Sequence, residues 1–556
     1  MSIPKGLIIY TAKRHHELYP VNIKYRHYSN IISLPPRTTI QDKDQTKITK
    51  VAKITKLVRH LDLALSLYPK TTQVMRYFSK LNRIKTFKCS FVIKVLKRAF
   101  RNMKDLEQIN LKSQRRLADN FGNFKHLLLQ RCLQKLTVDD LYCTQDMNDL
   151  AAFTKFVQVA NRRKCWPHLN SFGIDMKSFE HRAAHRNFVR GPGGNLLKFL
   201  QVFKACESLY KCAHFQLEIS NGLSNPSPEE CAAVDEIMKM KLPLSQVSLF
   251  HGEHFTSLFQ AAQDLKDLQS LKLVLSHGHV DSLEMNSLKE LPNLQDLTLV
   301  LELDDVNRAD FCYFALEKLQ GMTNLRSLSI DLYGDPSEVG DLLCEALSNL
   351  TQLTCLFLRF LEAYQDEEED EVKKEKLNWP WLKPVFQAIS KMKKLKTLHL
   401  EFLDFDRDGS SGIFKSLCQA LGNLTQLFSF HLVIGDAKSI QDEDLLTLAS
   451  SLTRLTRMKS LYICLGRLEL KFKSSTFVVL MDSIVNNLKI LSELFLNIDF
   501  GDVTKQYYQM IMEGIRQMKY LNRIIIENIG QVERGLDSTL LNAEIRKRMT
   551  GYVFGP

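Results

Sequence analysis

Three short stretches of the sequence contain residue types and spacings that could do chemistry. The stretch DFDRDGSSG begins like a calcium-binding loop, because oxygen ligands and a glycine stand at the expected offsets, at Asp404, Asp406, Asp408 and Gly409. Lys415, however, stands where the bidentate glutamate of such a loop belongs, and Ser411 replaces the usual aliphatic residue. The pattern therefore favours a polar loop before a helix over a calcium site.

The other two stretches are also incomplete. His181 and His185 are four residues apart, as two zinc ligands on one helical face would be, but HRAAH lacks the central Glu of a zinc protease. RGPGGN, residues 190–195, lacks the Lys-Ser/Thr ending of a phosphate-binding loop and indicates a turn before a helix over 196–203. The twelve cysteines form no CxxC pair. We therefore expect no catalytic residues, no cofactor, no metal site and no enzymatic activity.

The first 130 residues hold an excess of positive charge. They contain 27 Lys and Arg against 7 Asp and Glu, a net of +20, whereas the whole chain has a net charge of +13. This asymmetry indicates an acidic partner for the basic end, with RNA as the leading candidate and an anionic lipid or an acidic protein as alternatives. The residues expected to contact a polyanion are Lys53, Lys56, Arg59, Lys94, Lys97, Arg98 and Arg101.

A fourteen-residue phrase recurs along the second half of the chain. In LQGMTNLRSLSIDL, residues 319–332, apolar residues step by three up to Leu328 and then by two through Ile330 and Leu332. A step of three suits a helix end and a turn, whereas a step of two is typical of a strand. Further copies begin at Leu347, Ile389, Leu421, Leu452, Val485 and Ile515, and amphipathic helices are expected over 337–350, 442–455 and 474–488.

Tandem copies of LxxLxxLxLxL separated by helices resemble the leucine-rich repeat, and units near 30 residues resemble its long, ribonuclease-inhibitor-like class. The copies depart from the family where it often places Asn or Cys after the strand, since Tyr333, Leu361, Leu403 and Gly435 stand there. The resemblance implies an α/β fold, a horseshoe-shaped leucine-rich-repeat solenoid with a parallel β-sheet on the concave face and helices on the convex face. It also implies binding of macromolecules rather than catalysis.

The repeats suggest a division of the chain, because each unit is too small to bury its own apolar face and the two ends need caps. We expect a basic extended arm over 1–42, an N-terminal helical cap over 43–80, degenerate repeats over 81–260, regular repeats over 261–530 with an acidic insertion over 362–380, and a C-terminal cap over 531–556. Within the first cap, an amphipathic helix over 43–67 would bury Val51, Ile54, Val58, Leu61 and Leu65.

Alternate residues of each expected strand point away from the core. The first outward position forms a column across the repeats, which is polar at Lys272, Thr298 and Ser329 and then carries five rings, at Phe357, His399, His431, Tyr462 and Phe495. Because aromatic residues are enriched where partners bind, we expect these five residues to bind a protein on the concave face. The alternative is that the rings pack on one another or are covered by another part of the chain.

These features predict a non-catalytic scaffold for protein–protein interaction, with a basic N-terminal region for an acidic partner. One alternative is a structural subunit of a ribonucleoprotein or organellar complex that contacts RNA, and another is a substrate receptor of a ubiquitin ligase. The sequence has no apolar run long enough to span a membrane. Unpaired cysteines indicate an intracellular, reducing compartment, the cytoplasm or nucleus. Mitochondrial import through residues 1–42 is an alternative that their four prolines disfavour.

Overall fold

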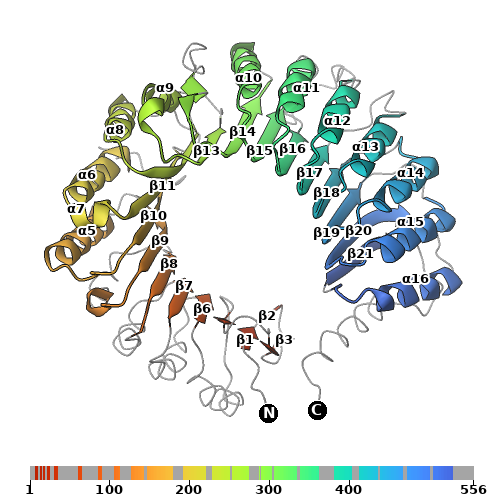
Figure 1. Ribbon diagram of the computed structural model, residues 1–556, viewed down its shortest axis with the longest axis horizontal. Helices are drawn as coiled ribbons and strands as arrows, with labels where there is room; N and C mark the ends of the chain where they lie inside the picture. The colour runs from red at the N-terminus through yellow and green to blue at the C-terminus, as the bar shows by residue number, and fades with distance from the viewer. Residues whose placement is uncertain are drawn as a thin grey trace. The chain divides into compact units, whose positions relative to one another are not determined.

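Strands and helices alternate along most of the chain in the computed structural model (Figure 1). The structure describes residues 7–10, 13–14, 17–18, 22–25, 31–34, 60–64, 85–90, 105–112, 127–142, 147–179, 192–220, 228–250, 253–274, 287–303 without 289, 306–334, 339–361, 381–402, 412–466 without 436 and 438, 472–500, 505–521 and 523–529. The chain divides into two compact units, Met1–Leu268 (unit 1) and Gln269–Pro556 (unit 2).

Unit 2 contains strands that pair in sequence order, each parallel to the next. The strands are β13 Ser270–Val274, β14 Asp296–Glu302, β15 Ser327–Tyr333, β16 Cys355–Leu361, β17 Thr397–Phe402, β18 Ser429–Ile434, β19 Ser460–Leu465, β20 Glu493–Phe500 and β21 Arg523–Ile529. The helices between them are α10 Val306–Leu319, α11 Gly340–Asn349, α12 Leu382–Ser390, α13 Ile413–Gly422, α14 Asp442–Leu452, α15 Ser474–Asn487 and α16 Lys505–Gln517. The strands line the inner side and the helices the outer side of this unit (Figure 1).

The core of unit 2 lies between its strands and helices. Strands β16 to β19 show strict alternation of buried and half-buried residues. Leu328 and Leu356 pair across β15 and β16 and are both 0% exposed, as the leucine phrase predicts. Each repeat is also joined to the one before it by backbone hydrogen bonds, such as the 2.7 Å bond from the Thr354 amide to the Arg326 carbonyl. Stacked leucine rows and backbone bonds together fix the strand register.

Trp381 fills the space between two repeats of unit 2. Its ring lies 5.3 Å from the ring of Phe360, and a Cβ added at Gly340 would come within 2.5 Å of it. Only a glycine at the start of α11 therefore lets the indole pack this closely.

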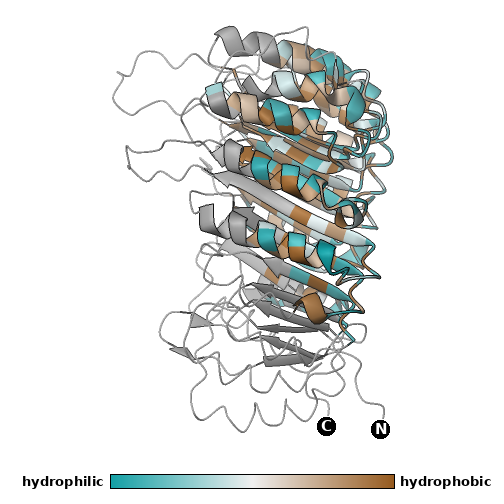
Figure 2. Cartoon of the chain, turned by 90° about the vertical axis from the view of Figure 1, so that its left-hand side faces the viewer, coloured by the Kyte–Doolittle hydropathy of each residue, from teal (hydrophilic) through white to brown (hydrophobic). Residues whose placement is uncertain are grey.

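Unit 1 also contains parallel strands in sequence order, from β5 to β12. They are β5 Ile31–Leu34, β6 His60–Ala64, β7 Thr86–Ser90, β8 Gln108–Lys112, β9 Lys135–Tyr142, β10 Ser171–Phe179, β11 Ala213–Ser220 and β12 Leu244–Leu249. The helices are α5 Met147–Arg162, α6 Pro192–Lys204, α7 Glu207–Tyr210, α8 Pro228–Lys239 and α9 Glu253–Gln260. Where Figure 2 colours the helices of this unit by hydropathy, hydrophobic and hydrophilic residues alternate along them. Both units thus have the α/β architecture of a leucine-rich-repeat solenoid.

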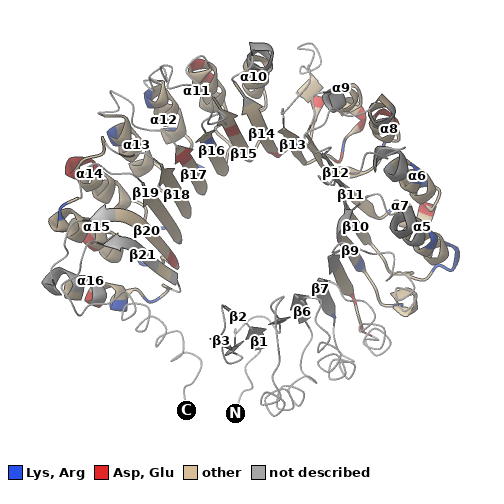
Figure 3. Ribbon diagram, turned by 180° about the vertical axis from the view of Figure 1, so that it is seen from behind, with Lys and Arg blue, Asp and Glu red and all other residues tan. Residues whose placement is uncertain are grey.

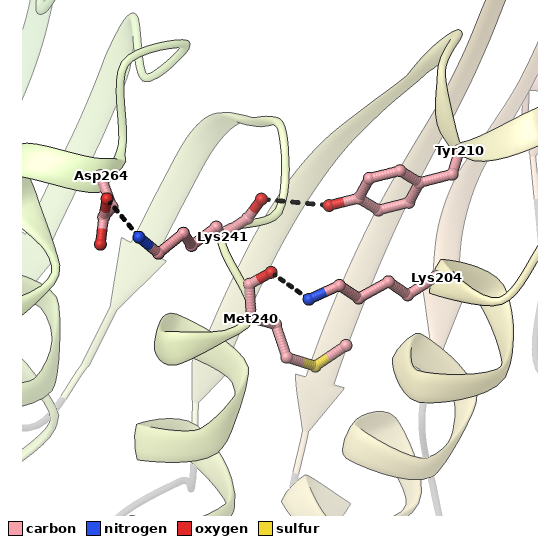
Figure 4. Close-up of polar contacts among 5 residues, drawn as sticks. All are labelled: Lys204, Tyr210, Met240, Lys241 and Asp264. Carbon is pink, nitrogen blue, oxygen red and sulfur yellow. Dashed lines mark hydrogen bonds and ion pairs between the residues drawn. The ribbon is translucent and has the colours of Figure 1, made fainter. Parts of the chain in front are cut away.

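Polar contacts join successive repeats of unit 1 beyond the helix ends (Figure 4). Lys204 Nζ donates to the Met240 carbonyl at 3.0 Å, and the Tyr210 hydroxyl donates to the Lys241 carbonyl at 3.0 Å. Lys241 Nζ in turn lies 2.9 Å from Asp264 Oδ1. Lys241 has a φ of 52°, the left-handed conformation in which helices often end. Lys204 and Tyr210 of the preceding repeat contact the backbone here, and Asp264 of the following repeat contacts the Lys241 side chain.

The structure corrects the sequence interpretation near the N-terminus. Residues 60–64 form strand β6, which pairs with β5 and β7, so the helix expected over 43–67 is wrong for these five residues. The physical reason is that Leu61 and Leu63 alternate at the period of a strand. Residues 43–59 lie outside the described residues.

The expected extended arm contains the short strands β1 Leu7–Tyr10, β2 Lys13–Arg14, β3 Glu17–Leu18, β4 Asn22–Tyr25 and β5. The insertion over 362–380 and the cap over 531–556 both lie outside the described residues.

Candidate protein-binding face

The five ring residues of the expected column occupy equivalent positions on five neighbouring strands of unit 2. Phe357 on β16 pairs with His399 on β17, and the series continues through His431 on β18, Tyr462 on β19 and Phe495 on β20. All five are half-buried, whereas the leucines that alternate with them are buried. We call this series of five rings the ring ladder.

The rings of the ladder stack on one another. The ring centroids of His399 and His431 are 4.0 Å apart, those of His431 and Tyr462 are 3.8 Å apart, and those of Tyr462 and Phe495 are 4.0 Å apart. The interplanar angles are 16°, 25° and 3°. Phe357 lies further away, 5.7 Å from His399 with a tilt of 41°. Four rings therefore form a close parallel stack, and the fifth is tilted against its end.

This stack follows from the strand register. Neighbouring strands lie about 4.8 Å apart, so side chains at paired positions are close enough for flat rings to touch face to face. Because the faces cover each other, the exposed part of each stacked ring is mainly its edge. Ring edges carry partial positive charge and suit hydrogen-bond acceptors or the faces of other rings. The rings thus align in one column and pack on one another, as the alternative stated, and their binding of a partner stays a prediction.

A cluster of charged residues lies beside one end of the ladder. Arg359 Nε donates a 2.7 Å hydrogen bond to Asp331 Oδ1, and Arg359 Nη2 donates to the other carboxylate oxygen. Asp331 is 3% exposed, and this two-point contact gives each of its carboxylate oxygens a hydrogen-bond donor. Glu401 on β17 is the next residue of the same column, and its Oε2 lies 3.7 Å from His399 Nε2. We call Asp331, Arg359 and Glu401 the charged cluster.

Burial keeps the two histidines of the ladder neutral near pH 7. Burial first, and then the neighbouring His399, lower the pKa of His431 to about 4, while Glu401 opposes the shift. Burial and then Arg359 lower the pKa of His399, against the effect of Asp331. The hydrogen bond from Arg359 to Asp331 raises the pKa of the guanidinium, so this residue stays charged. The ladder is therefore uncharged, and the charge at its end belongs to the charged cluster.

The strands under the middle of the ladder carry no charged residue. Neither β18, SFHLVI, nor β19, SLYICL, contains Lys, Arg, Asp or Glu, and both are tan in Figure 3. The inner face is thus apolar and ring-rich over β18 and β19 and charged over β15 to β17. This arrangement can hold a ligand by shape, apolar contact and one charged contact, but it assembles no nucleophile with an adjacent base.

The remaining sequence candidates lie outside the described residues. These are the polyanion-binding candidates Lys53, Lys56, Arg59, Lys94, Lys97, Arg98 and Arg101, the histidines of HRAAH and the aspartates of residues 404–408. Within the described ranges, no group of three or more His, Cys, Asp and Glu residues could hold a metal ion. No helix in the same ranges is long and apolar enough to cross a membrane. The division of the repeats near residue 260 stays a prediction.

Sequence analysis missed two features of this face. The first is the contact between Arg359 and Asp331. These two residues have opposite charges and occupy paired positions on the neighbouring strands β16 and β15. The second is the pair of glycines, Gly435 and Gly466, that follow β18 and β19. A Cβ added at Gly466 would lie 2.7 Å from the Gly435 carbonyl oxygen. The signal for both was present in the repeat alignment, where the charged residues and the glycines fall at matching positions.

Comparisons with known proteins add little about function. No protein-family model and no curated protein matches the chain. Among solved structures, the chain is similar to one titled the structure of the Toll–Spatzle complex, a molecular hub in Drosophila development and innate immunity, at 14% identity and a TM-score of 0.28. The match covers 91% of this chain and 63% of that chain, so this chain spans less than two thirds of the protein that it matches. This likeness is too distant to indicate a partner.

Proposed function

We propose that the chain is a non-catalytic scaffold of the ribonuclease-inhibitor-like class, and that the ring ladder of unit 2 binds a protein partner. The observation that carries the proposal is the row of five half-buried rings on one strand face. A leucine core needs no rings on the solvent side of its strands. Rings that are already stacked also lose little side-chain freedom when a partner binds, which favours affinity.

Affinity capture with matched variants tests this proposal. The full chain and the variants Phe357→Ala and Tyr462→Ala are used to capture proteins from a cell lysate, and the partner is then measured in purified form. Each variant should weaken binding by about 1 kcal/mol or more, as for residues at the centre of an interface. The control is Leu446→Ala on α14, a residue that is 40% exposed on the helical side. Binding that survives both ring variants, with melting temperatures unchanged, would exclude the ladder as the interface.

The basic N-terminal region supports a second function, recognition of a polyanion. Its support is the net charge of +20 within residues 1–130. If this region binds RNA, the logarithm of the binding constant should fall with the logarithm of salt concentration, by about 0.7 per phosphate for a single strand. Capture with and without nuclease separates an RNA partner from an acidic protein. A salt-independent interaction would contradict charge recognition at this end.

A further inference from the structure

On the inner face of unit 2, the side chains become smaller with distance along the strands from the ring ladder. Along β18 the outward positions are His431, Val433 and then Gly435, and along β19 they are Tyr462, Cys464 and then Gly466. Side chains therefore shorten from a ring to a small residue and then to bare backbone. We call the low area formed by Val433, Cys464, Gly435 and Gly466 the inner-face step.

Backbone packing keeps the step low. Because a Cβ at Gly466 would collide with the Gly435 carbonyl oxygen, no larger residue fits there without a shift of the strands. The Gly435 amide donates to the Phe402 carbonyl and the Gly466 amide donates to the Ile434 carbonyl, each at 2.7 Å. These hydrogen bonds hold the backbone in place. The bare positions are thus a fixed part of the surface, and Val433 and Cys464 lie between them and the ring edges.

The charged cluster lies next to this step, one strand away. Asp331 and Glu401 contribute two negative charges and Arg359 one positive charge, so the cluster has a net charge of −1. Asp331 is already satisfied by two hydrogen bonds from Arg359. The Glu401 side chain is 24% exposed and lies beside Arg359 on the neighbouring strand, whose pKa its charge helps to raise. The Arg359 guanidinium, however, gives its hydrogen bonds to Asp331. Glu401 is therefore the carboxylate of the charged cluster that has no hydrogen bond from Arg359.

We propose that the partner of the ring ladder contributes an extended peptide segment in which a Lys or Arg pairs with Glu401 and the neighbouring uncharged residues lie on the inner-face step against the edges of His431 and Tyr462. This inference rests on the proposed function and specifies the chemistry of the partner. The segment crosses the strands from β17 to β19, two intervals of about 4.8 Å, which an extended chain spans with about three residues. Backbone carbonyls of such a segment can face the positive ring edges.

Peptide libraries test the charge preference with the full chain. Three libraries of acetylated and amidated decapeptides share random uncharged residues and differ only in a central Lys, Gln or Glu. They are passed over the immobilised protein, and retained peptides are quantified by mass spectrometry. The Lys library should be retained about tenfold over the Glu library, because a like-charge contact at a partly buried carboxylate is unfavourable. Equal retention of the three libraries, or preference for Glu, overturns the inference.

Charge reversal provides the matched control. Glu401→Lys should switch the preference from the Lys library to the Glu library, whereas Glu513→Lys, at an exposed position on α16, should leave it unchanged. Bound Lys peptides should also slow alkylation of Cys464, which is half-buried on the step, and leave the exposed Cys132 of unit 1 unaffected. If Cys464 is not protected, the peptides do not lie on the step and the inference is wrong.

The outcome separates this inference from the proposed function. Suppose that Phe357→Ala and Tyr462→Ala both weaken binding of the captured protein, but the peptide libraries show no preference for Lys. The ring ladder would then still be the interface, and only the proposed basic segment of the partner would be wrong. Retention of that partner by both ring variants would remove the proposed function itself.

Discussion

Both units bury aromatic residues, but unit 2 also stacks them along its inner face. In unit 1, seven rings form a buried chain with centroid distances of 5.2 to 6.4 Å, made of Phe153, Phe156, Phe199, Phe203, Phe172, Phe215 and Trp166. In unit 2, leucines share the core with buried rings such as Phe360, Phe402 and Phe386, and five further rings stand on the other side of strands β16 to β20. The difference teaches that an unbroken strand register, as between β16 and β20, aligns ring after ring on the inner face, whereas unit 1, whose register shifts between β9 and β10 and between β11 and β12, gathers rings within its core.

The largest effect should come from removing a core ring of unit 1. Phe203 is 0% exposed and lies 5.2 Å from Phe215 and 5.5 Å from Phe172. Phe203→Ala should destabilise the protein by about 3–5 kcal/mol, because the cavity cannot collapse among three neighbouring rings. Hydrogen exchange measured by mass spectrometry should show loss of protection first around α6, β10 and β11. Uniform loss along the chain would mean that the ring cluster is not a local unit.

The matching change in unit 2 removes a core leucine. Leu356→Ala should cost about 2–5 kcal/mol and should loosen the neighbouring strands β15 and β17 first, since contacts in a repeat array are mostly with adjacent repeats. Denaturant unfolding gives the free energy and hydrogen exchange gives the location. A loss below about 1 kcal/mol would show that leucine rows do not carry the stability of unit 2.

A smaller effect is expected where two strands of unit 2 approach closely. Gly466→Ala should cost roughly 1–3 kcal/mol, because the new methyl group must displace the Gly435 carbonyl. The control is Gly422→Ala at the end of α13, where the added Cβ would meet Ser451 at 3.6 Å, an ordinary contact distance. This control should be neutral or stabilising by up to about 1 kcal/mol. Similar melting temperatures for the two variants would contradict the fixed inner-face step.

The smallest effect is a pH dependence that belongs to the ladder alone. His431 has a pKa of about 4 in the folded chain and near 6.5 when unfolded. The unfolded state therefore binds more protons between these values, and stability should fall as pH drops from about 6.5 to about 4, by roughly 1 kcal/mol after allowance for solvent screening. His431→Phe keeps a ring in the stack and should flatten this part of the melting-temperature profile. An unchanged profile would show that the imidazole stays solvated.

Much of this fold could be predicted from the sequence. The steps of two in the leucine phrase placed the strands of unit 2, and the range of degenerate repeats expected over 81–260 contains strands β7 to β12 of unit 1. The helices expected over 442–455 and 474–488 correspond to α14 and α15. Residues 60–64 were assigned to a helix because Leu61 and Leu65 also fit a helical step, and only pairing with neighbouring strands decides between the two periods.

The candidate site was predictable in its positions but not in its contacts. Strand alternation identified the ring column, since it needs only the repeat alignment. The near-parallel stack, and the choice of Arg359 to bond Asp331 rather than Glu401, depend on the twist and spacing of the strands and on side-chain rotamers. The low pKa of His431 likewise depends on the depth at which the stacked ring is buried, which no spacing in the sequence records.

Footprinting of the ring ladder tests the central claim most directly. Hydroxyl-radical labelling of the full chain, alone and with the captured partner, compares Tyr462 on the inner face with Tyr520, which is 52% exposed outside the ladder. The account predicts that the partner slows labelling of Tyr462 and Phe495 several-fold and leaves Tyr520 unchanged. Protection of Tyr520 or the outer helices, with Tyr462 labelled at the same rate in both states, would contradict it.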